Sequence, residues 1–433
     1  MDALAVMPKY DVYKDSGVSW LGIVPEKWKV IPAKRRHRVF KSINKRNQCD
    51  NVLSLTLRGV VNNNLENPEG LIPRDYASYQ VFEKDDLVFK LIDLENLKTS
   101  RVGIVHERGI MSPAYIRMSV NANHCPKYAY YYFYDLYLNA VYNNLGEGVR
   151  STLGPNDLLQ IVVVEPSFDE QVAIANFLDR KLVQVDEAIS IKEKQILLLK
   201  ERKQIIIQKA VTQGLNPDVP MKDSGVDWIG QIPEHWTVSK IGHYARVYNG
   251  STPSRDVSRY WENGTIPWMS SGKVNDYKIT TPSELVSEAA IRECSLRLFP
   301  KGTVLVGIVG QGKTRGTSAI LEIDAVINQN VAGIIPSNKL SSLFLHQYLI
   351  QAYEEVRNQG QGSNQEALNC QILSAFKIAF PPLNEQKAIV EFISDQSNTI
   401  DQTIEIQQSQ IYKLKEYKST LINSAVTGKI KVV

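Results

Sequence analysis

One segment of this sequence has residue types and a spacing that could bind the phosphates of a nucleotide. Residues 307–314 read GIVGQGKT, which satisfies the pattern GxxxxGK[ST] of loops that hold nucleotide phosphates in nucleotide hydrolases. That chemistry needs a helix that begins at Lys313, because the amide groups of a helix N-terminus face the phosphates. The residues that follow, RGTSAILEID, contain a glycine and a β-branched run, which predicts a strand. A nucleotide hydrolase that uses Lys313 stays an alternative interpretation.

A run of basic residues near the N-terminus has the composition of a phosphate-contacting surface. Residues 34–46, KRRHRVFKSINKR, contain seven lysines and arginines and no carboxylate. This charge density suits contact with the phosphates of a nucleic acid. The alternative is a solvated surface, which is the usual role of a charged run.

Three further segments have the composition of recognition loops. Residues 301–330 place the glycine-rich, basic tip between two β-rich runs. Their counterpart, residues 85–109, again indicates strand, polar loop and strand, with Lys98 and Arg101 in the loop but without a glycine-rich tip. Residues 247–275 mix turn residues, hydroxyl groups, basic residues and aromatic residues. Side chains on such loops can reach base edges, with Arg or Lys contacting guanine and Asn or Gln contacting adenine.

No other pattern in the sequence indicates catalysis or a metal site. The six histidines are scattered, and the four cysteines lie far apart without the CxxC spacing of a zinc site or redox pair. The aromatic run KYAYYYFYDLYL, residues 127–138, predicts a packed helix or strand, with base stacking as the alternative. We therefore expect a chain that carries no catalytic residues and no cofactor of its own.

Composition sets the class of protein. The chain has 433 residues, a net charge of +4 and an isoelectric point of about 8.6, which permit a nucleic-acid partner without requiring one. No apolar run reaches the ~18 residues of a membrane span, and the N-terminus does not read as a signal peptide. These features predict a cytoplasmic protein without a membrane partner.

Two segments of the chain are duplicated. KDSGVSWLGIVPEKWKV, residues 14–30, shares eleven of seventeen residues with KDSGVDWIGQIPEHWTV, residues 222–238. A longer segment, residues 168–212, matches residues 383–427. The regions between the repeats show little similarity, so the sequence predicts a constant frame that carries two different domains.

The longer repeats predict two helices that pair with each other. Apolar residues recur alternately every three and four positions, which is typical of a coiled-coil seam. A short connection after Gly214 favours an antiparallel pair, and ~44 residues give a rod of ~65 Å. The predicted seam residues are Leu178, Leu182, Val185, Ile189, Ile196, Leu199, Ile206, Ile393, Ile400, Ile404, Ile411, Leu414 and Leu421. Lys192 and Lys203 interrupt the first seam at the positions that Gln407 and Lys418 occupy in the second.

The expected fold is α+β, with two mixed α/β domains separated by the two antiparallel helices and related by a pseudo-twofold axis. The expected segments are a shared N-terminal segment (1–30), the first domain (31–165), the first long helix (166–214), a shared central segment (215–240), the second domain (241–379), and the second long helix with its tail (380–433).

These motifs resemble those of the specificity subunit of type I restriction-modification systems. The resemblance rests on the duplicated KDSGVxWxGxxPExW, the EQxAI openings at Glu170-Gln171 and Glu385-Gln386, the endings QKAVTQG and NSAVTG, and INQN at 327–330. It implies two target-recognition domains that each read one half of an asymmetric bipartite double-stranded DNA site, with the helices setting the gap. It further implies two methyltransferase subunits that use S-adenosylmethionine, and restriction subunits that use ATP and magnesium and join through the methyltransferase core.

Residue type and loop position predict the DNA contacts. In the first half they are Arg35, Arg36, Lys41, Lys45, Arg46, Arg58, Lys98 and Arg101. In the second half they are Ser251, Thr252, Arg255, Ser270, Lys273, Gln311, Lys313 and Arg315. A coiled-coil scaffold that binds only proteins is the remaining alternative.

Overall fold

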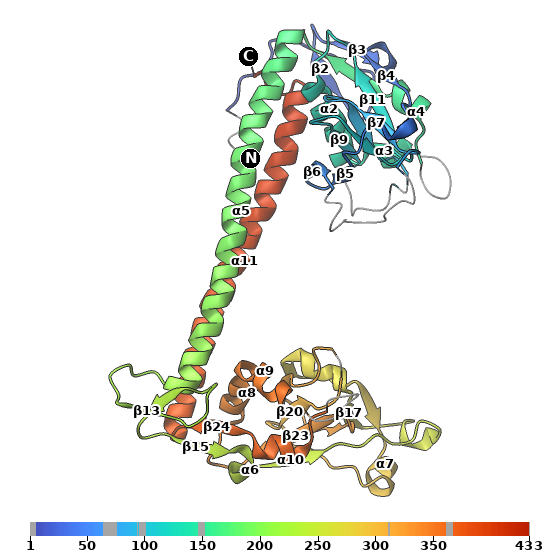
Figure 1. The fold of residues 1–433 in the computed structure, drawn as a ribbon. Coiled ribbons are helices and arrows are strands. Elements are labelled where there is room, and N and C mark those ends of the chain that lie inside the picture. Colours follow the sequence, from blue (N-terminus) through green and yellow to red (C-terminus); the bar gives the residue numbers. More distant parts are fainter. Residues whose placement is uncertain are drawn as a thin grey trace. The chain divides into compact units, whose positions relative to one another are not determined.

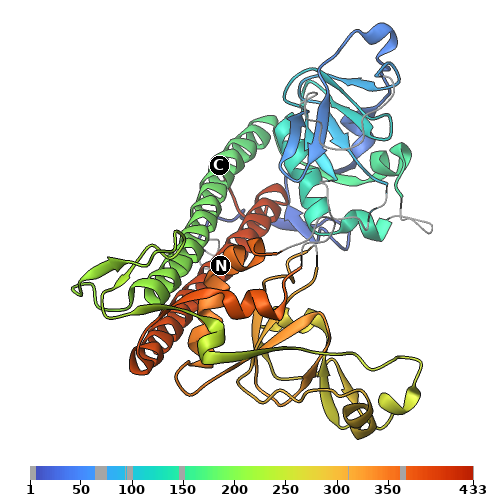
Figure 2. The same cartoon turned by 60° about the horizontal axis from the view of Figure 1, so that its bottom comes forward.

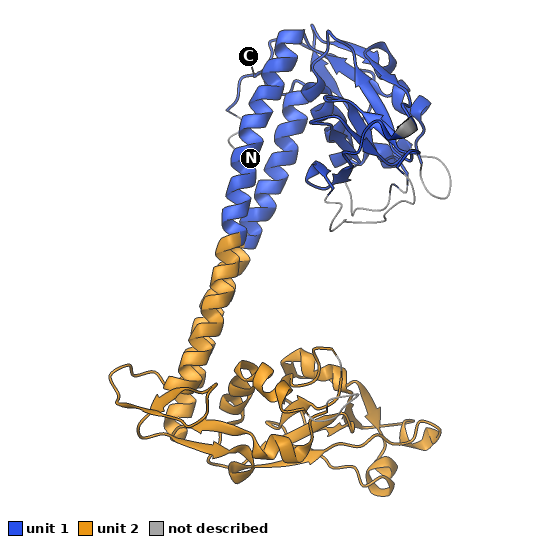
Figure 3. Cartoon of the chain, viewed as in Figure 1, with its two compact units in different colours: residues 1–193, 408–433 blue, residues 194–407 orange. Residues whose placement is uncertain are grey.

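The computed structural model describes residues 6–63, 76–92, 94, 101–145, 152–310, 312–360 and 367–432, apart from the side chain of Arg46. The chain forms two compact units (Figures 1 and 3). Unit 1 comprises Met1–Glu193 and Gln408–Val433, and unit 2 comprises Lys194–Gln407. Two long helices, α5 (Phe168–Gln213) and α11 (Leu383–Val426), each contribute to both units. The mixture of helices and strands confirms the predicted α+β class.

The described residues of unit 1 form many short strands and three helices besides parts of α5 and α11. The strands are β1 (Tyr13–Asp15), β2 (Ile23–Pro25), β3 (Lys29–Pro32), β4 (His37–Val39), β5 (Leu53–Thr56), β6 (Gly59–Asn62), β7 (Gln80–Phe82), β8 (Leu87–Phe89), β9 (Val102–Ile104), β10 (Gly109–Met111), β11 (Ile116–Val120) and β12 (Val162–Glu165). The helices are α2 (Pro126–Leu138), α3 (Val141–Leu145) and α4 (Pro155–Gln160), with 3₁₀ turns η1 (Ala33–Arg35) and η2 (Lys45–Asn47).

Unit 2 has a similar inventory. Its strands are β13 (Met221–Asp223), β14 (Gln231–Pro233), β15 (Thr237–Lys240), β16 (Ala245–Asn249), β17 (Ile266–Met269), β18 (Lys278–Ile279), β19 (Glu284–Val286), β20 (Val304–Gly307), β21 (Ser318–Leu321), β22 (Val326–Ile327), β23 (Val331–Pro336) and β24 (Lys377–Phe380). Its helices are α6 (Ile241–Tyr244), α7 (Glu288–Glu293), α8 (Ser342–Gln351), α9 (Tyr353–Asn358) and α10 (Cys370–Ala375), with 3₁₀ turns η3 (Ser258–Tyr260) and η4 (Ser271–Asp276).

The main sheets of the two units have the same strand order. Unit 1 has the order β4-β11-β8-β9, and unit 2 has β16-β23-β20-β21, with β18 added at its edge. In both units the four equivalent strands are antiparallel, whereas β18 pairs parallel to β21. This common plan lies in the regions where the two halves show little sequence similarity.

The central strands of both sheets are buried on both faces. In β20, Val304 and Val306 pack into the core with α8, while Leu305 packs with β17 and β22. In β8, Leu87 and Phe89 pack with α2, while Val88 packs with β5. Successive side chains of a strand point to opposite faces, so an uninterrupted apolar run suits a sheet that is covered on both sides.

The duplicated peptide forms the same two pairings in each unit. It folds into a hairpin, β1 with β2 and β13 with β14, followed by a strand that pairs with the end of the same domain. That strand is β3, paired with β12, in unit 1 and β15, paired with β24, in unit 2. An antiparallel pair of strands therefore joins the two ends of each domain, next to the start of a long helix.

Each long helix begins near a proline and ends near a glycine. Each starts within two residues of a proline, Pro166 or Pro382, and each is followed by a glycine in the left-handed region, Gly214 with φ +76° and Gly428 with φ +75°. Proline and acidic residues favour a helix start, and glycine favours the C-terminal cap because it accepts positive φ. No glycine or proline interrupts either helix.

The two helices lie side by side and run in opposite directions (Figures 1 and 2). Within unit 1, Lys418 bonds Asp186 and Lys192 bonds Gln410; within unit 2, Lys203 bonds Asp401. Most predicted seam residues are buried, and the half-buried ones are Leu199, Ile206 and Leu414. Near the end of α5 the buried position is Ile207 rather than Ile206. An α-helix has 3.6 residues per turn, so a repeat of 3.5 drifts around a straight helix.

The aromatic run forms helix α2, and most of its rings serve the core of unit 1. Tyr128, Tyr132 and Phe133 are buried between the sheet and the long helices. Tyr130 and Tyr134 are half-buried and stack on each other, with ring centroids 5.5 Å apart. The predicted packing role is confirmed for the buried rings.

Candidate nucleic-acid interface

A buried tryptophan of each duplicated peptide binds the first turn of a long helix. Trp236 is fully buried, and its indole Nε1 donates to Glu385 of α11 at 2.9 Å. Trp28, equally enclosed, donates to Glu170 of α5 at 3.4 Å. A buried indole N–H needs an acceptor, and the glutamate of each EQ motif supplies it. The peptide is therefore part of the frame that orients each domain.

The glutamine of each EQ motif holds a helix of the neighbouring domain. The side-chain oxygen of Gln171 accepts from the amide of Cys125, directly before α2, at 2.9 Å. Gln386 accepts from the amide of Ser341, directly before α8, at 2.7 Å. Both side-chain amides also donate to proline carbonyl groups, those of Pro166 and Pro381. Each long helix thus fixes one domain helix through buried hydrogen bonds.

The glycine-rich tip of unit 2 is a strand connection and not a nucleotide loop. The amide of Gly307 donates to the Thr317 carbonyl at 3.0 Å, and that of Gly316 donates to Gly307 at 2.9 Å. Strand β21 follows the tip, so no helix begins at Lys313. A phosphate would find neither the helix N-terminus nor these two amides available. The structure contradicts the alternative of a nucleotide hydrolase that uses Lys313.

Two side chains of helix α9 hydrogen-bond to the backbone of the glycine-rich tip. The Arg357 guanidinium donates to the carbonyl groups of Gly312 at 2.7 Å and Arg315 at 3.1 Å. Tyr353 donates its hydroxyl to the Lys313 carbonyl at 3.1 Å. The backbone around Lys313 is therefore held while its side chain is exposed. The side chain of Arg315 is only 8% exposed, and Gln311 lies outside the described residues.

A second surface of unit 2 gathers the predicted residues near β17 and β19. Arg255 forms a bidentate ion pair with Glu284 of β19, with nitrogen–oxygen distances of 2.6 and 2.7 Å. Its guanidinium carbon lies 3.5 Å from the centroid of the Trp261 ring and 5.3 Å from that of Trp268. The ion pair lowers the pKa of the Glu284 carboxyl and raises that of Arg255. Both groups stay charged at neutral pH.

The remaining predicted residues of this surface lie in hydrogen-bonded positions. The carbonyl of Ser251 accepts from the Trp268 indole at 3.4 Å, and the Thr252 hydroxyl donates to Gln329. The Ser270 hydroxyl bonds that of Ser283 at 3.0 Å. Lys273 is half-buried in η4 and bonds Asp276 at 2.8 Å and Thr281 at 3.2 Å. Unit 2 therefore presents an exposed set of hydroxyl, amide, guanidinium and carboxylate groups.

In unit 1 the predicted residues are more dispersed. Arg35 lies in η1 and Lys45 in η2. Lys41 lies in the loop between β4 and η2, and Arg58 lies in the turn between β5 and β6; all four are exposed. Arg36 is partly buried and pairs with Glu165 at the end of β12. Nothing is described for Lys98 or for the side chain of Arg46.

Two predicted contact residues are buried in the structure. Arg101 is 2% exposed and donates to the carbonyl of Ile92 at 3.1 Å. Arg315, within the glycine-rich tip, is 8% exposed, and its backbone carbonyl accepts from Arg357. Side chains with so little exposure are poorly placed to reach a base or phosphate in this conformation, so the structure disfavours direct contact by either. Residue type and loop position carry no information on which way a side chain is packed, so the sequence could not anticipate the burial of these two arginines.

Several residues of the unit 2 surface were not predicted. Glu284 and Trp261 hold Arg255, and Gln329 accepts from Thr252. Gln329 belongs to the INQN motif, which the sequence singled out, but Glu284 has no local signal. Its partner lies 29 positions away in the chain, and only the sheet brings the two together.

Two buried histidines in unit 1 are held neutral. His37 donates from Nδ1 to the Ala33 carbonyl at 3.0 Å, and its ring contacts that of His124 with the ring centroids 5.1 Å apart. Burial lowers the pKa of His37 to about 4, and that of His124 to about 3 with help from His37 and Arg36. These rings pack the core beside Phe133 rather than facing solvent.

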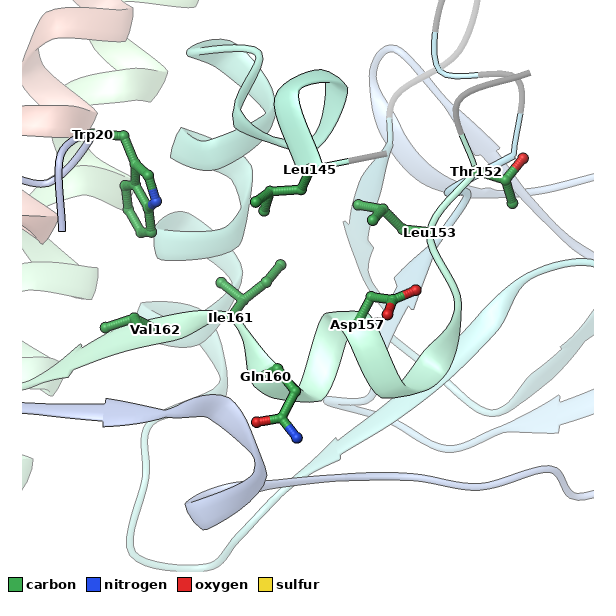
Figure 4. Close-up of a pocket in the computed structure, with 8 residues that line it drawn as sticks. All are labelled: Trp20, Leu145, Thr152, Leu153, Asp157, Gln160, Ile161 and Val162. Carbon is green, nitrogen blue, oxygen red and sulfur yellow. The ribbon is translucent and has the colours of Figure 1, made fainter. Parts of the chain in front are cut away.

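A pocket of about 480 Å³ in unit 1 is lined by the duplicated peptide and α4 (Figure 4). Trp20, Leu145 and Ile161 form apolar walls. Its polar groups are already engaged, because Asp157 accepts from the Gly154 amide at 2.8 Å and Gln160 from Lys34 at 3.2 Å. In unit 2 the equivalent Trp228 stacks on Phe376, with centroids 5.6 Å apart. The pocket offers no group arranged for catalysis.

The described residues contain neither a cluster suited to a metal ion nor a membrane-spanning helix. No cluster of three or more His, Cys, Asp or Glu side chains could hold a metal ion there. Within the same residues, no helix has the length and apolarity required to cross a membrane.

The chain is similar in sequence to proteins of one known family. Residues 233–414 match the family model described as the type I restriction modification DNA specificity domain. The MjaIX specificity subunit of Methanocaldococcus jannaschii is 34% identical over 172 residues, and the EcoR124I/EcoR124II specificity subunit of Escherichia coli is 25% identical over 167 residues. Each alignment covers 38% of this chain, and the chain spans only 39% and 41% of these relatives. The EcoBI specificity subunit of Escherichia coli is 22% identical over 90% of this chain and 82% of its own length.

Two solved structures share the fold over nearly the whole chain. One, from a study of complex assembly and conformational transition of the type I R-M system, gives a TM-score of 0.72 at 14% identity and covers 94% of this chain and 99% of its own. The HsdS subunit from Thermoanaerobacter tengcongensis gives 0.58 at 15% identity and covers 94% and 98%. At this identity the likeness concerns the fold alone.

Proposed function

Since the chain belongs to the family of type I restriction-modification specificity subunits, we propose that it recognises an asymmetric, bipartite site on double-stranded DNA. Each recognition domain, residues 31–165 and 241–379, reads one half of the site. The antiparallel helices act as an intramolecular coiled coil that sets the gap between the halves. The chain is non-catalytic, and it works in the cytoplasm, where bacterial and archaeal DNA lies.

One observation carries this proposal. The two units repeat the same frame contacts and the same strand order, yet expose different side chains. A repeated frame with different exposed side chains suits the reading of two different sequences by one chain. Phosphate contacts position such domains, whereas contacts with base edges specify the sequence. The exposed Arg35, Lys41, Lys45 and Arg58 suit the first role in unit 1.

The duplicated frame also supports the proposed partners. Equivalent surfaces on one chain, related by a pseudo-twofold axis, offer matching places to two copies of one protein. We assign these places to two methyltransferase subunits, which modify adenine with S-adenosylmethionine. Restriction subunits that use ATP and magnesium join through the methyltransferase core. No cofactor is assigned to this chain itself.

The proposal is tested by mapping modified bases. The chain is expressed with the methyltransferase subunits of its own system in a host that lacks adenine methylation, and modified adenines are located by long-read sequencing. A single bipartite motif with an unspecified gap is the expected result. Methylation without a bipartite motif, or none at all with assembled complex, contradicts the proposal.

A salt titration separates the proposal from a scaffold that binds only proteins. Phosphate contacts release counterions, so the logarithm of the DNA association constant should fall steeply and linearly with the logarithm of the salt concentration. Absence of binding to any duplex at low salt would favour the scaffold.

A further inference from the structure

We infer that Arg255 reads a guanine in the half-site bound by unit 2, and that Glu284 and Trp261 are positioning residues for this contact. The inference rests on the proposed function and adds to it the base and the supporting residues. It follows from the geometry around one exposed guanidinium, whose side chain is 53% exposed.

Arg255 is held in one orientation from two directions. Glu284 binds both terminal nitrogens, Nη1 at 2.6 Å and Nη2 at 2.7 Å, which fixes the plane of the guanidinium. Trp261 lies against one face of that plane at 3.5 Å. Such stacking and bidentate pairing suit the planar guanidinium and would not suit lysine.

The supports are themselves anchored. The indole of Trp261 donates to the Ser254 carbonyl at 3.1 Å, one residue before Arg255. Glu284 lies on β19 directly opposite Trp268 on β17, in an antiparallel pair. The ion pair and the stacked ring therefore belong to the small sheet, and the loop that carries Arg255 is tied to it.

The pair leaves donors for a base. A guanidinium has five N–H groups in a fixed fork, and end-on pairing with Glu284 takes one from each terminal nitrogen. The Nε–H edge is not consumed by this pairing. Guanine presents O6 and N7 as two acceptors in the major groove, and Arg is the side chain that most often binds both. A guanidinium that is already oriented loses less conformational freedom when it makes this contact.

The neighbouring groups fit the same surface. Thr252 lies three positions before Arg255 in the chain and bonds Gln329, and their hydroxyl and amide groups suit adjacent bases. Glu284 is 44% exposed, so its substitution removes a surface contact and no part of the core.

The chain offers a matched control. Arg259 pairs with Glu293 at 2.6 Å in the same unit, and Arg259 lies 5.5 Å from the Tyr260 ring. Glu293→Gln removes the same charge from an exposed ion pair without touching Arg255, Glu284 or Trp261. A general gain in DNA affinity from the lost negative charge would appear in both glutamine variants.

The first experiment maps modified adenines in cells that express the full complex with the wild-type chain, Arg255→Ala, Glu284→Gln or Glu293→Gln. We expect one G·C position of the motif to become degenerate in Arg255→Ala and Glu284→Gln, with the other half-site unchanged. Glu293→Gln should keep the wild-type motif. An unchanged motif in Arg255→Ala, or relaxation in Glu293→Gln as well, overturns the inference.

The second experiment measures binding of the assembled complex to duplexes that carry 7-deazaguanine at that position, which removes the N7 acceptor. Wild-type affinity should fall about tenfold, while Arg255→Ala should show no further loss. Glu284→Gln should lose most of the wild-type discrimination, and Glu284→Asp should recover part of it. Equal losses in the wild type and in Arg255→Ala contradict the assignment.

Different outcomes contradict the proposed function and the reading of guanine by Arg255. If the wild-type complex gives no bipartite motif, the proposed function falls. If it gives one and the Arg255 and Glu284 variants leave it intact, only the reading by Arg255 falls. Thermal melting of each variant confirms that lost discrimination does not arise from unfolding.

Discussion

Lys203 of α5 donates a hydrogen bond to Asp401 of α11, with Nζ 2.6 Å from Oδ2. The equivalent residues of the two repeats, Lys418 and Asp186, make the same pair with the helices exchanged, at 2.7 Å. Each long helix carries one acid and one base at matching places, so an antiparallel arrangement satisfies both pairs. This reciprocity favours one register of the helices over its neighbours.

These ion pairs are expected to contribute little stability by themselves. Both aspartates are more than half exposed, and exposed pairs typically contribute about 0.5 kcal/mol. A double-mutant cycle on Lys203→Ala and Asp401→Ala, read from urea unfolding, should give a coupling of about that size at low salt. It should approach zero at 1 M salt, because exposed charges are screened. A coupling of several kcal/mol that persists in salt would contradict a surface pair.

The contact between Trp236 and Glu385 should matter more. Glu385→Ala leaves the indole N–H buried without an acceptor and should lower the free energy of unfolding by about 1–3 kcal/mol. Glu391→Ala, an exposed site on the same helix, is the matched control and should change it by less than ~0.5 kcal/mol. Equal effects of the two substitutions would mean that the frame contact is not stabilising.

The buried histidines should make unit 1 sensitive to acid. Burial lowers the pKa of His37 to about 4 and of His124 to about 3, so the unfolded chain binds protons first as the pH falls below 6.5. The stability that the two neutral histidines contribute is fully present above pH 6.5, and it is lost as the pH falls toward their pKa values in the folded chain. The loss from His37 alone should be roughly 2 kcal/mol at pH 5.

Urea midpoints between pH 7.5 and 5 measure this effect. The urea midpoint should fall less steeply with decreasing pH in His124→Phe, which removes one titrating group while keeping an aromatic ring. A slope that is identical in the variant and the wild type would show that His124 does not contribute.

Lys313 should act through charge alone. The loop around Lys313 connects two strands and is no nucleotide-binding loop, so Lys313→Ala should not change ATP binding or hydrolysis by the chain. If the exposed amine meets a phosphate, DNA affinity should fall for all sequences alike, and the salt slope should decrease by about one. Fluorescence anisotropy over a salt series measures both quantities. A change in site choice without a change in slope would indicate a base contact instead.

The frame was largely predictable because its signals are local. Helix starts at proline, glycine caps and apolar spacing depend on neighbouring residues; α5 and α11 begin beside prolines and are followed by glycines, and most of the predicted seam residues are buried. The exceptions, such as Ile206 and Ile207, arise where the heptad spacing drifts from the helical period. The duplicated peptide was recognised from identity alone, although its bond from Trp236 to Glu385 was not.

The contact residues were less predictable because exposure depends on packing. Arg101 and Arg315 have the same side chain as Arg255, yet the first two are buried and the third is exposed. The difference is set by which elements cover each loop, and these come from distant parts of the chain.

By itself, then, the sequence determined the duplication, the paired helices, the α+β class and the absence of a recognisable catalytic motif, because each depends on short-range pattern or repetition. Only the tertiary structure decided that two dissimilar domains share one strand order, that the glycine-rich tip is clamped by Arg357, and that Glu284 meets Arg255. Those features depend on contacts between residues far apart in the chain, which no local pattern encodes.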